Sequence, residues 1–157
     1  MSRSLSNFIL KTTGTLFFTG YLPFIPGTFG SLVGVGLFIL LKGQVVNCSI
    51  ALLLLLVAGF LVSGRMEKLL KKKDPSCIVI DEACGMLIAL IFIPPDPKLV
   101  VLGFIFFRIL DTLKPYPASA LQNIKGSFGV MSDDIVAGIY TNIILQLILR
   151  SSCATFS

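Results

Sequence analysis

The chain has 157 residues, enough for one domain (1–157), of which 55% are hydrophobic and 13% charged, with a net charge of +5 and no histidine. Soluble domains average about a quarter charged residues, so the composition favours a multi-pass membrane protein, with a large-cored soluble helical protein as the alternative. The absence of histidine excludes histidine-containing catalytic triads, phosphohistidine nucleophiles and the usual zinc ligand sets.

The first motif along the chain is YLPFIPGTFGSLVG at 21–34, in which a Pro26-Gly27 turn leads into an apolar run. Backbone N–H groups at a helix start, flanked by glycines and hydroxyls, can bind an anion. The motif lacks the Gly-Lys-Ser/Thr ending of a P-loop, and a simple helix cap by Thr28 or Ser31 is the alternative. The predicted phosphate-binding residues here are Gly27, Thr28, Gly30 and Ser31.

Five apolar runs are predicted to form helices, and only the second approaches the roughly 20 residues that cross a bilayer. The shorter runs suit either incomplete spans or the core helices of a soluble fold. The runs are 29–41, 45–62, 83–93, 99–110 and 135–149.

Two turns, 42–44 and 94–98, are predicted to be hairpin tips, the second because its three prolines cannot continue a helix. If both hairpins cross a membrane, the polar segments 65–82 and 111–134 share one face and both tips lie on the other. The stretch RMEKLLKKK at 65–73 carries five basic residues and one acidic residue. The positive-inside rule therefore predicts a cytoplasmic polar face, and the basic run suits an anionic lipid surface.

Acidic residues are scarce and clustered. Five of the eight lie in three short, otherwise apolar motifs, IVIDEACG, FFRILDTLKPYP and GVMSDDIVAG. A helix cap needs one carboxylate, whereas two of these motifs present adjacent pairs, which repel unless a cation balances them. Hard oxygen ligands select Mg²⁺. The predicted metal ligands and catalytic acids are Asp81, Glu82, Asp111, Asp133 and Asp134.

Two basic residues accompany these acids. Arg108, Asp111 and Lys114 follow i, i+3 spacing, so they share a helix face if the helix persists to Lys114. Arg108 lies in the apolar stretch LGFIFFRIL, a costly place for a charge, and is expected to hold a carboxylate or phosphate through two hydrogen bonds. A local salt-bridge ladder is the alternative. Arg108 and Lys114 are the predicted clamp for an anionic, phosphorylated substrate.

At these residues the chain resembles the phosphatidylglycerophosphatase A family, bacterial membrane enzymes that dephosphorylate phosphatidylglycerophosphate. The matching stretches are PFIPGTFGSL, DEACGMLIAL, FFRILDTLKPYP and GVMSDDIVAG, spread over 23–138 in the family's order. One departure is Ser127, where the family often has a second glycine. The resemblance implies an all-helical fold, Mg²⁺ dependence, and hydrolysis of the phosphomonoester to phosphatidylglycerol and phosphate.

The resemblance further implies a multi-pass protein of the bacterial inner membrane with its active site facing the cytoplasm. The expected partners are the lipid substrate and an anionic membrane, with no nucleic acid; the sequence carries no indication of oligomeric state. A CDP-alcohol phosphotransferase is a rival enzyme, although its DGxxAR…GxxxDxxxD signature is absent. A cation channel or transporter is the rival of another class, and it would place its acids near mid-bilayer rather than at the ends of the apolar runs.

Overall fold

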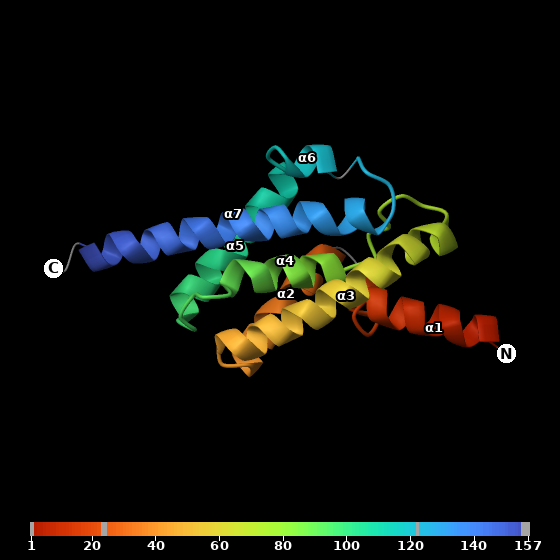
Figure 1. The fold of residues 1–157 in the computed structure, drawn as a ribbon, viewed down its shortest axis with the longest axis horizontal. Helices are drawn as coiled ribbons and strands as arrows, with labels where there is room; N and C mark the ends of the chain where they lie inside the picture. Colours follow the sequence, from red (N-terminus) through yellow and green to blue (C-terminus); the bar gives the residue numbers. More distant parts are fainter. Residues whose placement is uncertain (1, 23–24, 122, 155–157) are drawn as a thin grey trace.

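The structure, a computed structural model, describes residues 2–22, 25–121 and 123–154 as helices joined by short connections. Figure 1 shows α7 along much of the long axis of the molecule, with α4 beside it and α1 at the end opposite to the C-terminal end of α7. In chain order the elements are α1 (Ser2–Gly14), the 3₁₀ turn η1 (Thr19–Tyr21), α2 (Pro26–Leu40), α3 (Val45–Leu70), α4 (Ile80–Leu90), α5 (Pro97–Leu113), α6 (Ala118–Leu121) and α7 (Ser127–Ala154).

The sequence explains where several helices begin and end. Pro26 and Pro97 open α2 and α5, because a helix needs no N–H donor at its first position. Asp96 caps α5 by accepting hydrogen bonds from the N–H groups of Lys98, at 2.7 Å, and Leu99, at 3.4 Å. Lys114 adopts a left-handed conformation that ends α5.

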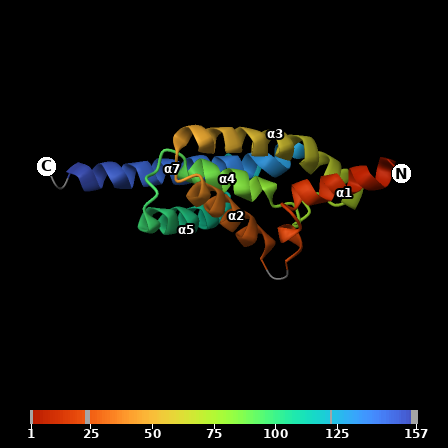
Figure 2. The ribbon, with the colours of Figure 1, turned by 90° about the horizontal axis from the view of Figure 1, so that it is seen from below.

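Both predicted hairpins are present. Residues 41–44 connect α2 to α3, and residues 91–96 connect α4 to α5. The two tips touch, because a Cβ placed on Gly43 would lie 3.3 Å from Pro95 Cδ. Figure 2 shows α3 on one side of α4 and α7, with α2 and α5 on the other.

Two helices are longer than predicted. The expected run 45–62 continues to Leu70, so part of the basic segment is helical and the connecting loop starts only at Lys71. The expected run 135–149 begins at Ser127, which places Asp133 and Asp134 inside α7 rather than before it. In both cases the helix continues through polar residues, whereas the apolar pattern of the sequence predicts only its apolar part.

The short helix α4 is the core of the molecule. Of its 11 residues all but Glu82 and Ile88 are buried, against α2, α3, α5 and α7. Eleven residues make roughly 17 Å of helix, about half of a bilayer's hydrocarbon thickness. Neighbouring helices therefore enclose α4, and it does not cross a membrane by itself.

The outer surface is apolar. Two helices, 45–70 and 127–151, are long and apolar enough to cross a membrane by length and composition. Large exposed hydrophobic side chains cover the outer faces of four helices, a surface that suits lipid rather than water. Examples are Leu32, Ile39, Leu53, Leu54, Val57, Leu61, Val101, Ile105, Ile143 and Leu147. The chain is therefore a membrane-associated helical protein.

Glycines allow α4 to approach its neighbours closely. A Cβ on Gly85 would lie 2.5 Å from the Asp134 carbonyl oxygen and 2.7 Å from the Phe107 ring. By contrast, a Cβ on Gly36 of α2 would meet no atom within 4 Å. The α4–α7 crossing, which aligns two acidic motifs, thus depends on Gly85.

We expect Gly85→Ala to lower the free energy of unfolding by about 1–3 kcal/mol, because an extra methyl group overfills a packed crossing. The matched control Gly36→Ala should leave stability unchanged or raise it by up to about 1 kcal/mol, since alanine favours a helix over glycine. Thermal unfolding of both variants in the same detergent measures the difference. Equal stability of the two proteins would contradict the close crossing.

Candidate active site

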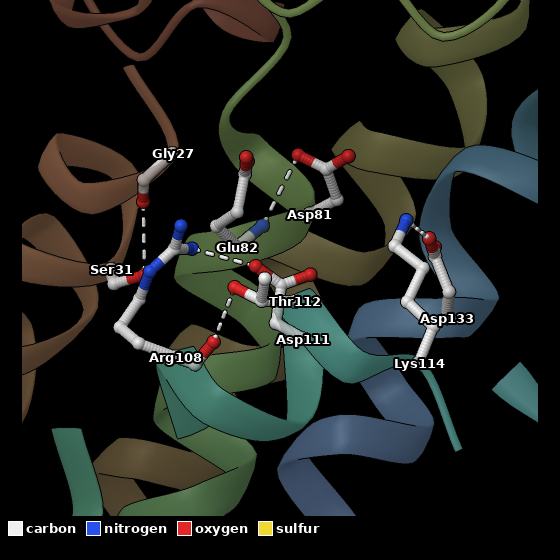
Figure 3. A network of polar contacts seen from close by, with 9 residues as sticks. All are labelled: Gly27, Ser31, Asp81, Glu82, Arg108, Asp111, Thr112, Lys114 and Asp133. Atoms are coloured by element: carbon white, nitrogen blue, oxygen red, sulfur yellow. Dashed lines mark hydrogen bonds and ion pairs between the residues drawn. The ribbon is translucent and has the colours of Figure 1, made fainter. Parts of the chain in front are cut away.

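The three acidic motifs converge in space. Asp81 and Glu82 lie in the first turn of α4, Asp111 in the last turn of α5, and Asp133 and Asp134 in the second turn of α7. Figure 3 shows four of these five acids together with Arg108 and Lys114. The structure therefore brings all seven predicted catalytic residues into one region, from segments far apart in the sequence.

Three of the carboxylates form a tight group. One side-chain oxygen each from Asp81, Glu82 and Asp134 lies within 4.8 Å of the other two. Asp81 and Asp134 are buried, and Glu82 is partly so. Among the described residues, Glu82 Oε2 and Asp134 Oδ1 are buried with no hydrogen-bond partner. Such oxygens are costly unless something binds them, so the group fits a small, hard cation.

The raised pKa of Glu82 also favours a cation in this group. Glu82 lies at the start of α4, outside both candidate membrane spans. Burial, with a further contribution from the Asp134 charge, raises the pKa of Glu82 to about 8. A bound cation would compensate for the repulsion and keep the carboxylates ionised.

The other two acids are in ion pairs. Arg108 Nη1 lies 2.7 Å from Asp111 Oδ2, and Lys114 Nζ lies 2.6 Å from Asp133 Oδ2. Burial alone would lower the pKa of Lys114, but the hydrogen bond and charge of Asp133 outweigh it and the pKa lies above its ordinary value. The predicted Arg108–Asp111 pairing is present. The shared face with Lys114 is not, because the chain leaves the helix at Lys114 and turns this side chain toward α7.

An open recess of about 340 Å³ lies beside the acidic group. Gly27 at the start of α2 forms part of its wall, next to Glu82 and Arg108. A Cβ on Gly27 would lie 2.7 Å from Glu82 Oε1 and 3.3 Å from Arg108 Nη1. The absence of a side chain at this position therefore leaves room beside the guanidinium. Further residues lining the recess are Ile25, Pro26, Asp74, Ser76, Asp111, Thr112 and Lys114.

The remaining residues of the first motif have packing contacts. The buried Ser31 hydroxyl donates a hydrogen bond to the Gly27 carbonyl at 2.9 Å. A Cβ on Gly30 would lie 2.8 Å from the Val79 carbonyl oxygen, so Gly30 lets α2 contact the start of α4. The N-cap of α2 is Ile25, with no side-chain cap, so the alternative of capping by Thr28 or Ser31 is wrong. Phosphate binding by Thr28, Gly30 and Ser31 stays a prediction.

Sequence reasoning missed two acids near the site. Asp74 lines the recess, and its charge acts on Asp81 and Asp133. Glu67 of α3 accepts hydrogen bonds from the backbone N–H groups of Asp74 and Gly126, each at 2.9 Å. Glu67 therefore holds two loops beside the site. Glu67 lies in the basic segment 65–73 and Asp74 directly follows it, so from the sequence both resemble residues of a solvated loop.

Ser127, at which the chain departs from the family pattern, has a hydrogen-bond partner in α3. Its hydroxyl oxygen accepts a hydrogen bond from the Gly64 N–H at 2.8 Å, which joins the start of α7 to α3.

A helical, membrane-associated bundle with grouped carboxylates beside an arginine and a lysine has the charged groups that hydrolysis of a phosphomonoester needs. The sequence profile of the family Phosphatidylglycerophosphatase A matches residues 12–149. The chain belongs to this family, and it is a phosphatase acting on phosphoric monoesters.

Three curated relatives are similar over most of the chain. An Escherichia coli (strain K12) protein named "Phosphatidylglycerophosphatase A" is 37% identical over 84% of this chain and 78% of its own length. A Haemophilus influenzae protein of the same name is 31% identical over 82% of each chain. A Bacteroides thetaiotaomicron protein named "Putative phosphatidylinositol-3-phosphatase" is 34% identical over 90% of this chain and 94% of its own length. No solved structure matches the chain.

Replacing Arg108 by lysine tests whether the guanidinium contacts the substrate phosphate. Lysine can keep the pairing with Asp111 but cannot reproduce a planar two-point contact with phosphate. We expect Arg108→Lys to lower the rate of phosphate release from a lipid phosphomonoester at least about tenfold, with a melting temperature close to that of the unchanged protein.

The control is Arg150→Lys, which makes the same change at an exposed position on α7. Melting temperature and turnover are measured on the same preparations. If Arg108→Lys melts early but the folded fraction turns over normally, Arg108 is a structural partner of Asp111 and not a substrate clamp.

Proposed function

We propose that the protein hydrolyses phosphatidylglycerophosphate to phosphatidylglycerol and phosphate, with Mg²⁺ as cofactor. The observation that carries the proposal is the group formed by Asp81, Glu82 and Asp134, two of whose buried oxygens lack partners, beside a recess lined by Arg108. Family membership supports the choice of a phosphomonoester.

In this proposal Asp81, Glu82 and Asp134 hold the ion, Asp111 is a further ligand, and Asp133 is the spare carboxylate. Carboxylate oxygens are the ligands that Mg²⁺ prefers, and the unpartnered oxygens of Glu82 and Asp134 give it binding positions. A bound Mg²⁺ supplies Lewis-acid polarisation of a phosphoryl oxygen and lowers the pKa of a water.

The protein's own residues bind and orient the substrate. Arg108 and Lys114 line the recess and neutralise phosphate oxygens as negative charge develops. Asp111 fixes one edge of the guanidinium through its 2.7 Å contact. Gly27 leaves space for a phosphate to approach that group.

One carboxylate must also take the proton of the attacking water. Asp133 suits this role, because Lys114 holds one of its oxygens while Oδ1 is buried without a hydrogen-bond partner among the described residues. A covalent aspartyl-phosphate route is the alternative, and it would show a burst of bound phosphate in rapid-quench experiments.

One observation favours a second substrate. The Bacteroides thetaiotaomicron relative is named "Putative phosphatidylinositol-3-phosphatase". Phosphatidylinositol 3-phosphate is also a lipid phosphomonoester, so the same group of residues would serve it. Initial rates of phosphate release from both lipids, presented in identical detergent micelles, decide between the two substrates.

For the membrane arrangement, we propose a multi-pass protein of the inner membrane with the site on the cytoplasmic face. The support is the touching hairpin tips at Gly43 and Pro95 and the basic segment 65–73, which lies at the opposite end of α3 from its hairpin. This places the acids near one membrane surface, whereas a cation channel or transporter would have them at mid-depth.

We expect Asp134→Asn and Asp81→Asn each to lower phosphate release by at least about a hundredfold, because an amide is a poor Mg²⁺ ligand. The matched control is Asp96→Asn, which changes an acid at a hairpin tip. EDTA should abolish phosphate release by the unchanged protein. Added Mg²⁺ should raise the melting temperature of the unchanged protein but not that of Asp134→Asn. Activity that persists after chelation would refute the metal proposal.

We expect single cysteines at Lys72 and Asn123 to resist an impermeant thiol reagent in intact cells and to react once the cells are permeabilised. A cysteine at Pro94, in the hairpin tip, should react from outside. The background lacks the four native cysteines. Labelling of position 72 or 123 in intact cells would reverse the proposed orientation.

A further inference from the structure

Five lysines form a cationic feature of the surface, away from the acidic group. Lys68, Lys71, Lys72, Lys73 and Lys125 line a recess of about 500 Å³, here called the lysine recess. Four of them come from the end of α3 and the loop after it, and Lys125 comes from the loop before α7. The recess shares no lining residue with the catalytic recess.

The lysine recess carries an excess of positive charge. Glu67 is its only acidic lining residue, against five lysines, and both of its carboxylate oxygens already accept hydrogen bonds from backbone N–H groups. Neither the Arg108–Asp111 pair nor the Lys114–Asp133 pair involves a lysine of the recess. The five ammonium groups therefore concentrate positive charge around one hollow, which selects an anion.

A second hollow, here called the apolar hollow because Phe60 and Leu61 form one end of it, adjoins the lysine recess. It has a volume of about 350 Å³, is also lined by Gly64, Arg65 and Ser127, and shares Lys68 and Gly126 with the lysine recess. The Phe60 ring also lies 6.0 Å from the Phe128 ring of α7, between centroids. Along α3 the lining thus changes from aromatic and aliphatic to cationic.

The spacing of this change fits a membrane surface. Leu61 and Lys68 are seven residues apart on one helix, which is about 10 Å. The polar headgroup layer of a bilayer is roughly 5–8 Å thick on each side of the hydrocarbon. With α3 crossing the membrane, Phe60 and Leu61 lie at the depth of the acyl chains when Lys68 lies at the depth of the phosphates.

We infer that the lysine recess and its apolar hollow together bind one anionic phospholipid, distinct from the substrate. Its phosphate lies among Lys68, Lys72 and Lys125, and an acyl chain lies along Phe60 and Leu61. The positive charge selects the headgroup, and the apolar hollow distinguishes a lipid from a free phosphate.

The test measures lipid binding by the delipidated full chain in detergent, using native mass spectrometry with dioleoylphosphatidylserine and, separately, dioleoylphosphatidylcholine. We expect the serine lipid to bind more tightly, and the triple variant Lys68→Gln, Lys72→Gln, Lys125→Gln to bind it about a hundredfold more weakly. The matched control, Lys42→Gln, Lys98→Gln, Arg150→Gln, makes the same charge change elsewhere and should bind as the unchanged protein does.

Two further arms identify the ligand. Leu61→Asn should weaken lipid binding without abolishing the preference for the anionic headgroup, and inorganic phosphate at millimolar concentration should not displace the lipid. Equal binding by the two triple variants, or full displacement by phosphate, would overturn the inference. Hydrolysis of a dihexanoyl lipid phosphomonoester, which needs only the catalytic recess, should be unchanged in both triple variants. If the unchanged protein does not hydrolyse this lipid, the proposed function is wrong, and the lipid-binding comparison still tests the lysine recess.

Discussion

The rest of the structure depends on holding mutually repelling carboxylates in an apolar interior. Asp81, Glu82 and Asp134 share one small volume, and nearby charges are matched one to one, with Arg108 on Asp111 and Lys114 on Asp133. Removing charge from water costs several kcal/mol for each group. The two ion pairs leave the group of Asp81, Glu82 and Asp134 to be balanced by bound protons or by a cation.

The surrounding packing keeps this group in place. Gly85 brings the backbone of α4 against the Asp134 carbonyl, and Gly30 brings α2 against the Val79 carbonyl. Glu67 fastens the loops at Asp74 and Gly126 to α3. The acids thus sit on rigid helices whose spacing is set by backbone contacts, and their positions do not rely on flexible side chains.

Much of this could be predicted from the sequence, because charge is rare in so apolar a chain. The three acidic motifs, the Arg108–Asp111 pair and both hairpin tips followed from local spacing. The start of α7 did not, because residues 127–134 are polar enough to resemble a loop although they are helical. The turn at Lys114 toward Asp133 and the contact of Glu67 with Gly126 join segments 19 and 59 residues apart, which local patterns do not encode.

The enclosure of α4 has a consequence for the membranes in which the protein can work. A bilayer thicker or thinner than the apolar length of α3 and α7 is accommodated by tilting those helices or by deforming the lipid around them. α7 packs against the buried α4 and also carries Asp133 and Asp134, so tilting α7 alone would pull the acidic group apart. The close α4–α7 crossing at Gly85 therefore favours tilting of the bundle as one body or deformation of the lipid, and either adjustment leaves the surroundings of the acids unchanged.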